Sequence, residues 1–483
     1  MGVISWLCYT IVMAQTFFFY DLETSGLNPR QDRIMQFAGQ RTDMNLEPIG
    51  EPYNLLVTLN DDTLPNPDAL MVTGITPQKT VEEGYTEAQF ARMLSEEIFT
   101  PDTIAVGFNN IRFDDEFIRH LLWRNFHDPY EWSWKDGRSR WDLLDVVRLT
   151  RALRPEGINW PLDYKGEPSN RLELITSTNG IAHENAHDAL ADVTALIAVT
   201  KLIKQKQPQL YDYLLKMRDK KVVQQLVNVD DKKPFVYASG RYDKEFAKTT
   251  VAFPLTTSRN GGVVAYDLRY DPTSFVELSV EELSAKIFAS WEERQAEDFV
   301  KLPVKELQYN RCPAVAPLGV LEQGDGWQKI SLDLKTMQKH QNILLNHPDF
   351  AEKLRTIFEN KPAFKKLLDP EAQLYDGFLN DRDHIRVEAV HNADERELAD
   401  FHPEFQDERL VPLLLHYKAR NFPRSLSEDD LAQWEAWRAQ RLQAQLPGFM
   451  ASLQRLASTA TDEQQFILQE LQLWAEAVLP SSD

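Results

Sequence analysis

The chain is poor in cysteine, with only Cys8 and Cys312 among its 483 residues. Two cysteines exclude a disulfide framework and a zinc site built from thiolates, and they are typical of a protein from a reducing cytoplasm. Long apolar segments are lacking too, because the N-terminal stretch Val3 to Met13 is shorter than the roughly 20 residues that a membrane span requires. We therefore expect a cytoplasmic protein with no membrane partner.

Basic residues are absent from the N-terminus, where no Lys or Arg precedes Arg30. A secretory signal peptide begins with a basic region, so residues 1–15 do not fit one. We interpret these residues as an N-terminal extension and Met13 as the functional start of the protein. The alternative is a tail that is disordered or that lengthens the first strand.

Basic residues are also outnumbered, since 53 Lys and Arg face 74 Asp and Glu, for a net charge of −21. This balance argues against tight, non-specific binding of duplex nucleic acid, which depends on Lys and Arg contacts to phosphates. Net charge describes the long-range field, however, and a narrow basic channel for one strand is still compatible with it. Hydrophobic content of 43% and charged content of 26% are typical of a soluble globular protein. A chain of this length suggests roughly two to four domains.

The pattern of apolar residues divides the chain into three parts. Residues 16–205 alternate strands and helices, which predicts an α/β domain with a mixed sheet. Its expected strands are Thr16–Tyr20, Ile34–Arg41, Glu51–Leu59 and Thr103–Gly107, and its expected helices are Thr86–Ile98, Glu116–Arg124, Leu143–Leu153 and Ala189–Lys204. Residues 208–360 read as β-rich, with strands at Pro234–Ser239, Thr250–Leu255, Gly262–Leu268, Ser274–Leu278 and Leu302–Gln308 and one helix at Val280–Trp291.

Residues 361–483 are predicted to be helical. Thr461 and Gln464 form a capping box ahead of a helix whose apolar residues lie on one stripe. The predicted buried residues of this helix and of the helix at Glu428–Leu446 are Ile467, Leu471, Trp474 and Val478, and Leu431, Trp434, Leu442 and Leu446, respectively. We interpret the tryptophans here as core.

Two carboxylates, Asp21 and Glu23, follow the buried-looking run Phe17 to Tyr20. Residues i and i+2 of a strand point to the same side, so both side chains project together. Like charges at the edge of a core are costly unless a cation lies between them. The pair therefore predicts a metal site, and the alternative is a solvated strand end.

Further candidate ligands come from two later segments. Asp114 follows a short strand and the polar turn Asn109-Asn110, and Asp115 is its immediate rival. His187 and Asp192 lie at the start of the helix that follows Asn185, where both can reach one concave site. The alternative for His187 is a helix-terminal residue with no catalytic part, and Asp188 is better placed as an acid favourable to the helix dipole. An oxygen-rich set with one imidazole suits Mg²⁺ or Mn²⁺ rather than zinc.

These motifs resemble the DEDDh group of 3′→5′ exonucleases, with D-x-E on the first strand, N-x-x-F-D in the middle and H-x4-D on a late helix. Within that group the chain is similar to the bacterial exodeoxyribonuclease I family. The similarity extends from about Thr16 to the C-terminus and includes four further segments, Trp132–Trp134, Ser139–Val146, Ala152–Pro161 and Tyr417–Pro423. The family pattern places the acid directly after Phe113, which favours Asp114 over Asp115.

The resemblance implies a ribonuclease H-like exonuclease domain, then an SH3-like domain, then a C-terminal helical domain. It implies hydrolysis of single-stranded DNA from the 3′ end to 5′-mononucleotides with two Mg²⁺ ions, which Mn²⁺ can replace. Asp21 would bridge the ions, Glu23 and Asp192 would hold one, and Asp114 would hold the other. His187 would accept the proton of the attacking water. A clamp of three domains would give processive digestion in DNA repair and recombination.

The resemblance also implies partners and contacts with the substrate strand. We expect a monomer that binds the acidic C-terminal tail of single-stranded DNA-binding protein, through Arg148 or basic residues of Tyr417–Pro423. Aromatics interleaved with arginines suit stacking on unpaired bases. The expected substrate-binding residues are Glu23, Gly74, Arg119, Tyr130, Trp134, Arg148 and Arg171. The alternative is that the aromatic residues belong to the core. The loop from Ser239 to Lys248 could close over the strand or be an ordinary exposed loop.

Two other functions compete with this hypothesis. An RNA 3′-exonuclease would share the acidic residues, and only the long downstream extension and the Trp- and Arg-rich segments speak against it. A non-catalytic nucleic-acid clamp on the same fold is disfavoured because all five catalytic positions are filled.

Overall fold

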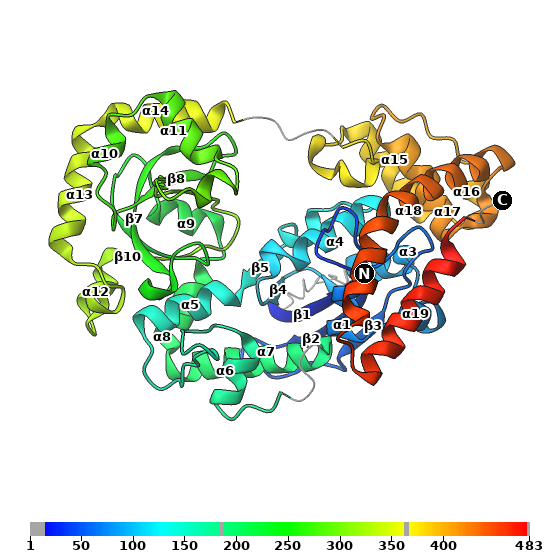
Figure 1. The fold of residues 1–483 in the computed structure, drawn as a ribbon, viewed down its shortest axis with the longest axis horizontal. Helices are drawn as coiled ribbons and strands as arrows, with labels where there is room; N and C mark the ends of the chain where they lie inside the picture. Colours follow the sequence, from blue (N-terminus) through cyan, green and yellow to red (C-terminus); the bar gives the residue numbers. More distant parts are fainter. Residues whose placement is uncertain (1–14, 184–187, 362–366, 481–483) are drawn as a thin grey trace, which may run out of the picture. The chain divides into compact units, whose positions relative to one another are not determined.

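The computed structural model describes residues 15–183, 188–361 and 367–480, and the chain folds as two compact units (Figure 1). The first unit comprises Met1–Arg140, Asn185–Thr194 and Lys366–Asp483, and the second comprises Trp141–Glu184 and Ala195–Lys365. The prediction for the functional start at Met13 lies outside the described residues and stays a prediction. The expected domain boundaries likewise stay predictions.

The first unit contains a sheet with the strand order β3-β2-β1-β4-β5, whose last strand, β5, continues into the second unit. Its strands are β1 (Thr16–Thr24), β2 (Ile34–Thr42), β3 (Tyr53–Leu56), β4 (Thr103–Gly107) and β5 (Ser139–Asp142). β2 is antiparallel to both β1 and β3, whereas β1 and β4 are parallel. This order and these directions agree with the ribonuclease H-like fold that the resemblance implies, and the predicted mixed sheet is confirmed.

β1 is the central strand because its apolar residues are buried on both faces of the sheet. Phe17 to Tyr20 are completely inaccessible to solvent. Phe18 and Tyr20 pack with Phe37 of β2 and with Phe99 in one aromatic core. Such a continuous apolar run is typical of a strand covered on both faces. The core fixes β1 and therefore the two carboxylates at its end.

Short helices precede β4, and the sequence analysis missed two of them. They are α1 (Pro67–Thr73), α2 (Pro77–Glu83) and α3 (Glu87–Met93), and α3 continues as a π-helical turn, Leu94–Ile98. Asn66 and Thr76 cap α1 and α2, and each helix begins with proline. These are ordinary helix-start signals, but helices of seven residues are too short to show apolar periodicity. α4 (Asp114–Arg124) then carries the third candidate acid.

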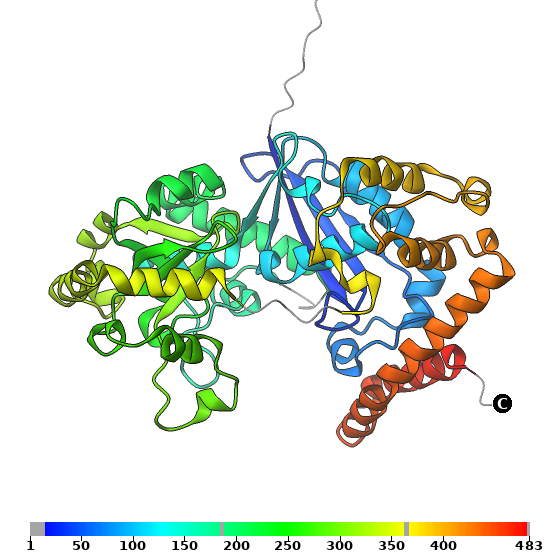
Figure 2. The same ribbon diagram turned by 90° about the horizontal axis from the view of Figure 1, so that it is seen from above.

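The C-terminal helices belong to the same unit as this sheet, and they form one core with β2 and another with α4. They are α15 (Asp381–Asn392), α16 (Glu395–Ala399), α17 (Leu410–Asn421), α18 (Glu428–Ala457) and α19 (Asp462–Val478). Leu442 and Trp474 pack with Leu70 of α1, and Leu413 packs with Trp123 of α4. Figures 1 and 2 show α18 and α19 lying side by side. The helical prediction for this region is confirmed.

The predicted inward faces of α18 and α19 are correct except at one position. Trp434, Leu442, Leu471 and Trp474 are buried, but Leu431 is 49% exposed. Leu431 lies in the first turn of α18, before the helix reaches its packing partners, so the prediction there is wrong. Across the described residues no helix is both long enough and apolar enough to cross a bilayer.

The second unit contains an antiparallel five-stranded sheet with the order β10-β6-β7-β8-β9. Its strands are β6 (Phe235–Ala238), β7 (Thr249–Thr257), β8 (Val263–Asp267), β9 (Val304–Leu307) and β10 (Ala314–Pro317). Its longer helices are α5 (Leu143–Leu153), α7 (Ala189–Lys206, which begins in the first unit), α8 (Pro208–Lys216), α11 (Val280–Phe288), α13 (Leu334–Asn346) and α14 (Pro348–Glu359). The predicted β-rich region is confirmed, although α13 and α14 were not expected.

The predicted strand Ser274–Leu278 is wrong, because this segment contains the short helix α10 (Thr273–Val276). Asp271 accepts hydrogen bonds from the backbone N–H and the hydroxyl of Thr273, at 3.0 and 2.6 Å. This turn directs the chain into a helical turn that buries Phe275 and Val276. Side-chain hydrogen bonding to the backbone thus overrides the β-propensity of a short apolar run.

Gly107 at the end of β4 allows a close approach that a larger residue would prevent. A Cβ at this position would lie 2.5 Å from the Cβ of Asn110. Gly107→Ala should therefore lower the free energy of unfolding by about 1–3 kcal/mol through overpacking. Gly448→Ala is the matched control, because it lies in α18 with open space around its Cβ position and should be neutral or slightly stabilising. Urea unfolding of both variants tests this, and equal stability of the two would contradict it.

Candidate active site

Asp21 and Glu23 lie where β1 runs past the end of its parallel neighbour. β1 pairs with β4 from Thr16 to Phe19, so both acids extend beyond the paired segment. They alternate with the buried Leu22 and project to the same face, as the sequence predicts. Ligands of open α/β sheets collect at the carboxyl ends of the strands, where the loops diverge. The local geometry therefore presents two carboxylates at the edge of a packed core.

Asp192 reaches the same place from the first turn of α7. Its ligand oxygen and those of Asp21 and Glu23 all lie within 4.8 Å of one another. Asp188 caps the helix, because its Oδ1 accepts the N–H of Ala191 at 3.0 Å. The structure thus gives Asp188 the helix-terminal position that the sequence suggests. His187 lies outside the described residues, so its predicted role stays a prediction.

The structure separates Asp114 from its rival Asp115. Asp115 is fully buried and binds the hydroxyl of Tyr20 through one oxygen and the guanidinium of Arg140 through the other. Asn110 also donates to Asp115, at 3.2 Å. Asp115 therefore fixes α4 against β1 as a neutralised carboxylate. Asp114 is close enough to Asp21 and Glu23 for its charge to raise the pKa of both.

The electrostatics of this cluster favour a bound cation. Burial, followed by the charges of Asp114, Glu23 and Asp192, raises the pKa of Asp21 well above its ordinary value. Burial and then the charge of Asp192 raise the pKa of Glu23 to about 8. Within the described part of the chain, no Lys or Arg forms an ion pair with Asp21 or Glu23. An all-oxygen set with this unbalanced charge fits a hard divalent ion such as Mg²⁺ or Mn²⁺.

A second group with suitable ligand atoms, Asp369, Glu371 and His416, shows the opposite electrostatics. The guanidinium groups of Arg33 and Arg420 bind Glu371. They hold the pKa of Glu371 well below its ordinary value despite burial. Because arginines already neutralise this group, we assign it no metal. The contrast supports Asp21, Glu23 and Asp192 as the metal site.

Three predicted strand-binding residues of the first unit have different surroundings. Trp134 is 64% exposed. Tyr130 is half-buried, and the guanidinium carbon of Arg119 lies 5.6 Å from its ring centroid. Arg119 also donates to Glu116 at 3.1 Å. Trp134 is thus open for stacking on a base, whereas Arg119 and Tyr130 form a fixed pair.

Two aromatic residues beside this pair were missed by the sequence analysis. The ring of Phe378 lies 6.0 Å from that of Tyr130, and Tyr375 accepts a hydrogen bond from Arg119 at 3.4 Å. Phe378 is 89% exposed and Tyr375 is 45% exposed. Both lie more than 240 residues after Tyr130 in the chain. No local pattern connects such distant positions, so only the fold brings them together.

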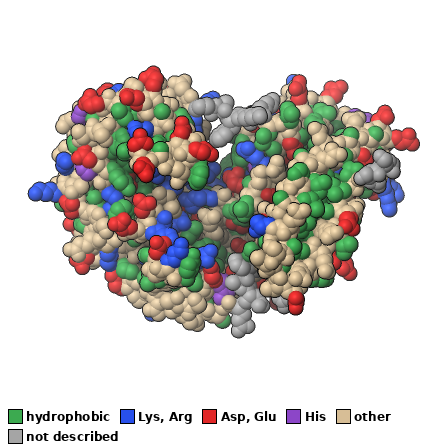
Figure 3. Space-filling view, in the orientation of Figure 1, with side chains coloured by type: hydrophobic (Ala, Val, Ile, Leu, Met, Phe, Trp, Pro, Cys, Tyr) green, Lys and Arg blue, Asp and Glu red, His purple; other side chains and the backbone are tan. Residues whose placement is uncertain are grey.

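The predicted residues of the second unit lie on two of its helices. Arg148 of α5 pairs with Asp145 at 2.5 Å. Arg171 precedes α6 (Leu172–Thr178), is 74% exposed and lies 3.6 Å from Glu173. Burial and then the charge of Arg148 lower the pKa of Lys248, so these two cations are neighbours. Figure 3 shows Lys and Arg side chains gathered over this unit despite the acidic net charge.

Gly74 and the tail-binding candidates complete the predicted set. Gly74 ends α1 in the left-handed conformation, with φ of 68° and open space around its Cβ position. In the segment Tyr417–Pro423, the side chains of Lys418 and Arg420 are buried. These two basic residues are therefore poorly accessible to a partner, and the side chain of Arg148 is 14% exposed and paired with Asp145, so the site for the acidic tail stays a prediction.

Comparison with known proteins gives matches along nearly the whole chain. Family models match as "Exonuclease" over residues 18–200, "Exonuclease I SH3-like domain" over 218–360 and "Exonuclease I C-terminal domain" over 368–478. Exodeoxyribonuclease I of Haemophilus influenzae is 40% identical over 450 residues, which cover 92% of this chain and 95% of that protein.

Solved structures agree with these matches. Exonuclease I from Methylocaldum szegediense is 39% identical with a TM-score of 0.92, covering 97% of this chain and 100% of that one. The zinc-bound complex of Escherichia coli exonuclease I with single-stranded DNA is 38% identical with a TM-score of 0.91, covering 96% and 99%.

The raised pKa of Glu23 makes stability depend on pH when a chelator is present. Between about pH 4.5 and 8 the folded protein keeps a proton on Glu23 that the unfolded chain has released. The free energy of unfolding should therefore fall as pH rises through this window. Saturating Mg²⁺ should reverse the fall, because it replaces the proton.

Thermal unfolding of Glu23→Gln in chelator checks this prediction, since the variant should lose much of the pH dependence. Glu281→Gln, at an exposed position of α11, serves as the control and should keep the wild-type dependence. If the stability of Glu23→Gln changed with pH as steeply as that of the wild type, Glu23 would not be the group responsible for the pH dependence.

Proposed function

The chain belongs to the exonuclease I family, and on this premise we propose that it degrades single-stranded DNA from the 3′ end to 5′-mononucleotides. The proposal rests on one observation above the others. Ligand oxygens of Asp21, Glu23 and Asp192 converge within 4.8 Å at the end of β1, and no Lys or Arg of the described residues forms an ion pair with Asp21 or Glu23. Exonuclease I relatives with single-stranded DNA and with zinc support both the substrate and the use of a divalent ion.

Mg²⁺ is the proposed cofactor, with two ions and with Mn²⁺ as a substitute. Asp21, Glu23 and Asp192 would hold the ions, and Asp114 would add a fourth carboxylate. Bound there, divalent ions would make the attacking water more acidic and neutralise charge on the scissile phosphate. The described side chains of this donor set offer only oxygen atoms and carry excess negative charge. Both properties fit the binding of divalent ions.

The remaining steps are assigned to side chains of this chain. His187 would take the proton of the attacking water, since an imidazole titrates near neutral pH. Asp115, bound to Tyr20 and Arg140, would keep α4 and hence Asp114 in place. Trp134 would stack on an unpaired base, and Arg171 and Arg148 would contact phosphates of the strand. Gly74 would allow close backbone approach to the terminal nucleotide.

We place this activity in DNA repair and recombination in the cytoplasm and expect a processive monomer. The proposed protein partner is the acidic C-terminal tail of single-stranded DNA-binding protein. The nearness of Lys248 to Arg148 supports a local positive surface that could receive such a tail, although the whole chain is acidic. The same surface could instead guide the DNA strand, so binding of a tail peptide and of DNA should compete there.

A comparison of 3′-labelled DNA and RNA oligomers of one sequence tests the function. The DNA should release labelled mononucleotide in the presence of Mg²⁺, and the RNA should be degraded far more slowly. Asp21→Asn should lower the rate on DNA by more than about 100-fold, the scale of single catalytic groups. Asp429→Asn, an exposed acid of α18, is the control with wild-type activity. Preferential cleavage of RNA would overturn the substrate assignment, and an active Asp21→Asn would overturn the metal assignment.

Trp134 gives a separate test of strand binding. Stacking of one base on an aromatic ring contributes about 1–3 kcal/mol, so Trp134→Ala should raise KM for single-stranded DNA roughly 5- to 150-fold with little change in kcat. Trp291→Ala is a matched control, because Trp291 is a comparably exposed tryptophan of the second unit. Steady-state kinetics on an oligothymidine measure both. Equal KM values for the two variants would remove Trp134 from the strand-binding surface.

A further inference from the structure

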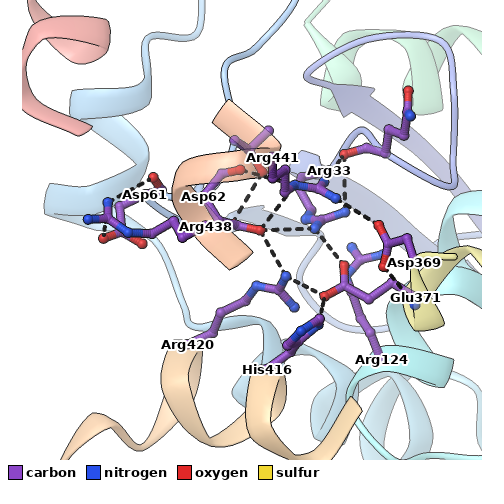
Figure 4. A network of polar contacts seen from close by, with 12 residues as sticks. Arg33, Asp61, Asp62, Arg124, Asp369, Glu371, His416, Arg420, Arg438 and Arg441 are labelled. Atoms are coloured by element: carbon purple, nitrogen blue, oxygen red, sulfur yellow. Dashed lines mark hydrogen bonds and ion pairs between the residues drawn. The ribbon is translucent and has the colours of Figure 1, made fainter. Parts of the chain in front are cut away.

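A network of charges, buried except at its Asp61 end, connects the C-terminal region to the loop that follows the catalytic strand (Figure 4). Its arginines and acids alternate, and each is in contact with at least one residue of opposite charge. The members are Arg33, Arg124, Arg420, Arg438 and Arg441, and Asp61, Asp62, Glu87, Asp369 and Glu371. Such a network costs desolvation energy and is not needed for a packed core, because apolar residues of similar volume would serve. Because the network lies between the C-terminal region and the loop after β1, we infer that it fixes the geometry of that loop.

Arg33 is the member nearest the catalytic strand. Its side chain is completely buried. Figure 4 shows its guanidinium between Asp62 and Glu371, and Nη2 lies 2.8 Å from Oε2 of Glu371 and 3.4 Å from Oδ2 of Asp62. Glu371 comes from the C-terminal region, more than 330 residues later in the chain. The side chain of Arg33 is therefore fixed from outside the exonuclease sheet.

The backbone of Arg33 is fixed to the end of β1. The N–H of Arg33 donates to Oγ of Ser25 at 2.9 Å, and the N–H of Ser25 donates to the carbonyl of Arg33 at 2.8 Å. Ser25 directly follows β1 and is two residues from Glu23. The register of β1 against β2 shifts between Glu23 and Thr24. Irregularities of this kind are common next to active sites, and this one directly follows a candidate metal ligand.

The C-terminal region holds the same loop at a second point and braces Glu371 itself. Arg441 donates to the carbonyl of Gln31 at 2.8 Å and pairs with Asp369 at 3.0 Å. Glu371 is bound by Arg420 and lies 3.0 Å from Nδ1 of His416. Charge-assisted contacts of this type are short and directional. The loop from Gln31 to Arg33 therefore has little freedom while Glu371 is ionised.

We propose that Glu371 is a positioning residue for catalysis, which acts through Arg33 and Ser25 to set the orientation of Glu23 in the metal site. Glu371 touches neither substrate nor metal in this arrangement. The C-terminal helices thereby become part of the catalytic apparatus, in addition to any contact they make with DNA. The inference rests on the proposed function, because it concerns the geometry of the same metal site.

Glu371→Gln is the direct test, since it keeps the shape of the side chain but removes its charge. The variant should bind Mn²⁺ at the active site more weakly, as measured by electron paramagnetic resonance titration, and it should need more Mg²⁺ for half-maximal activity. Its kcat should fall roughly 10- to 100-fold, the scale of small misplacements of catalytic groups, with KM for single-stranded DNA unchanged. Wild-type Mn²⁺ binding and kcat in a folded Glu371→Gln would overturn the proposal.

Asp383→Asn is the matched control for destabilisation. Asp383 is an equally buried acid of the C-terminal region, where it accepts the N–H groups of Gln406 and Asp407 at 3.0 and 2.9 Å and pairs with Arg386 at 3.2 Å. Among the described residues, none of its hydrogen bonds or ion pairs involves the loop after β1. Asp383→Asn should lower thermal stability yet keep wild-type Mn²⁺ affinity and kcat. A loss of Mn²⁺ affinity in this control equal to that in Glu371→Gln would mean that both effects follow stability, which contradicts positioning.

Ser25→Ala tests the second link and remains informative if Glu371→Gln fails to fold. It removes the hydroxyl that accepts from Arg33, and it should weaken Mn²⁺ binding in the same direction. Where both variants fold, the double variant should lose less than the product of the single losses, because the two residues act through one path. Unaltered Mn²⁺ binding in Ser25→Ala, or fully additive losses, would overturn the proposal. Mn²⁺ binding is measured without turnover, so a wild-type protein that lacks nuclease activity would refute the proposed function alone.

Discussion

Electrostatic repulsion among the carboxylates at the end of β1 is the constraint on which the rest of the site depends. Asp21, Glu23, Asp114 and Asp192 approach one another beside a core of buried aromatic rings, and burial strengthens their repulsion. A fold can hold such a group only if other interactions keep the side chains in place. Here a fully buried central strand, a capped helix and the Tyr20–Asp115–Arg140 contacts supply that support. A divalent cation among these carboxylates would relieve their repulsion, so the arrangement favours cation binding.

The described residues of the first unit include two clusters of acids whose electrostatic surroundings are opposite. Around Glu371, guanidinium groups balance the carboxylates, and the pKa of Glu371 lies well below its ordinary value. Around Asp21, the pKa is raised well above its ordinary value, and no described Lys or Arg pairs with that acid. The first arrangement is neutralised by arginines, and the second is the candidate site for cations. Arg33 and Ser25 join the first arrangement to the strand that carries the site.

The C-terminal helices are consequently more than an appended domain. They form one apolar core with β2 and another with α4, and they contribute Arg420 and Arg441 to the charged network. The segment just before α15 contributes Glu371 and places Tyr375 and Phe378 beside Tyr130. Family membership along nearly the whole chain accords with this integration, because the matching models include the C-terminal region as well as the exonuclease. A nuclease core reduced to residues 16–205 would keep Asp62 beside Arg33 but would lose Glu371.

The sequence by itself determined the central strand, the shared face of Asp21 and Glu23 and the three-part order of the chain, because these follow from local periodicity and from motifs. The family pattern already favoured Asp114 over Asp115, and the tertiary structure added the reason that Asp115 is occupied by Tyr20 and Arg140. Only the tertiary structure revealed α10 in place of a strand, the exposure of Leu431, and the contacts of Glu371 and Phe378. Periodicity reports which face of an element is apolar. Partners hundreds of residues apart leave no such local trace, since their contact energy arises only when the elements pack.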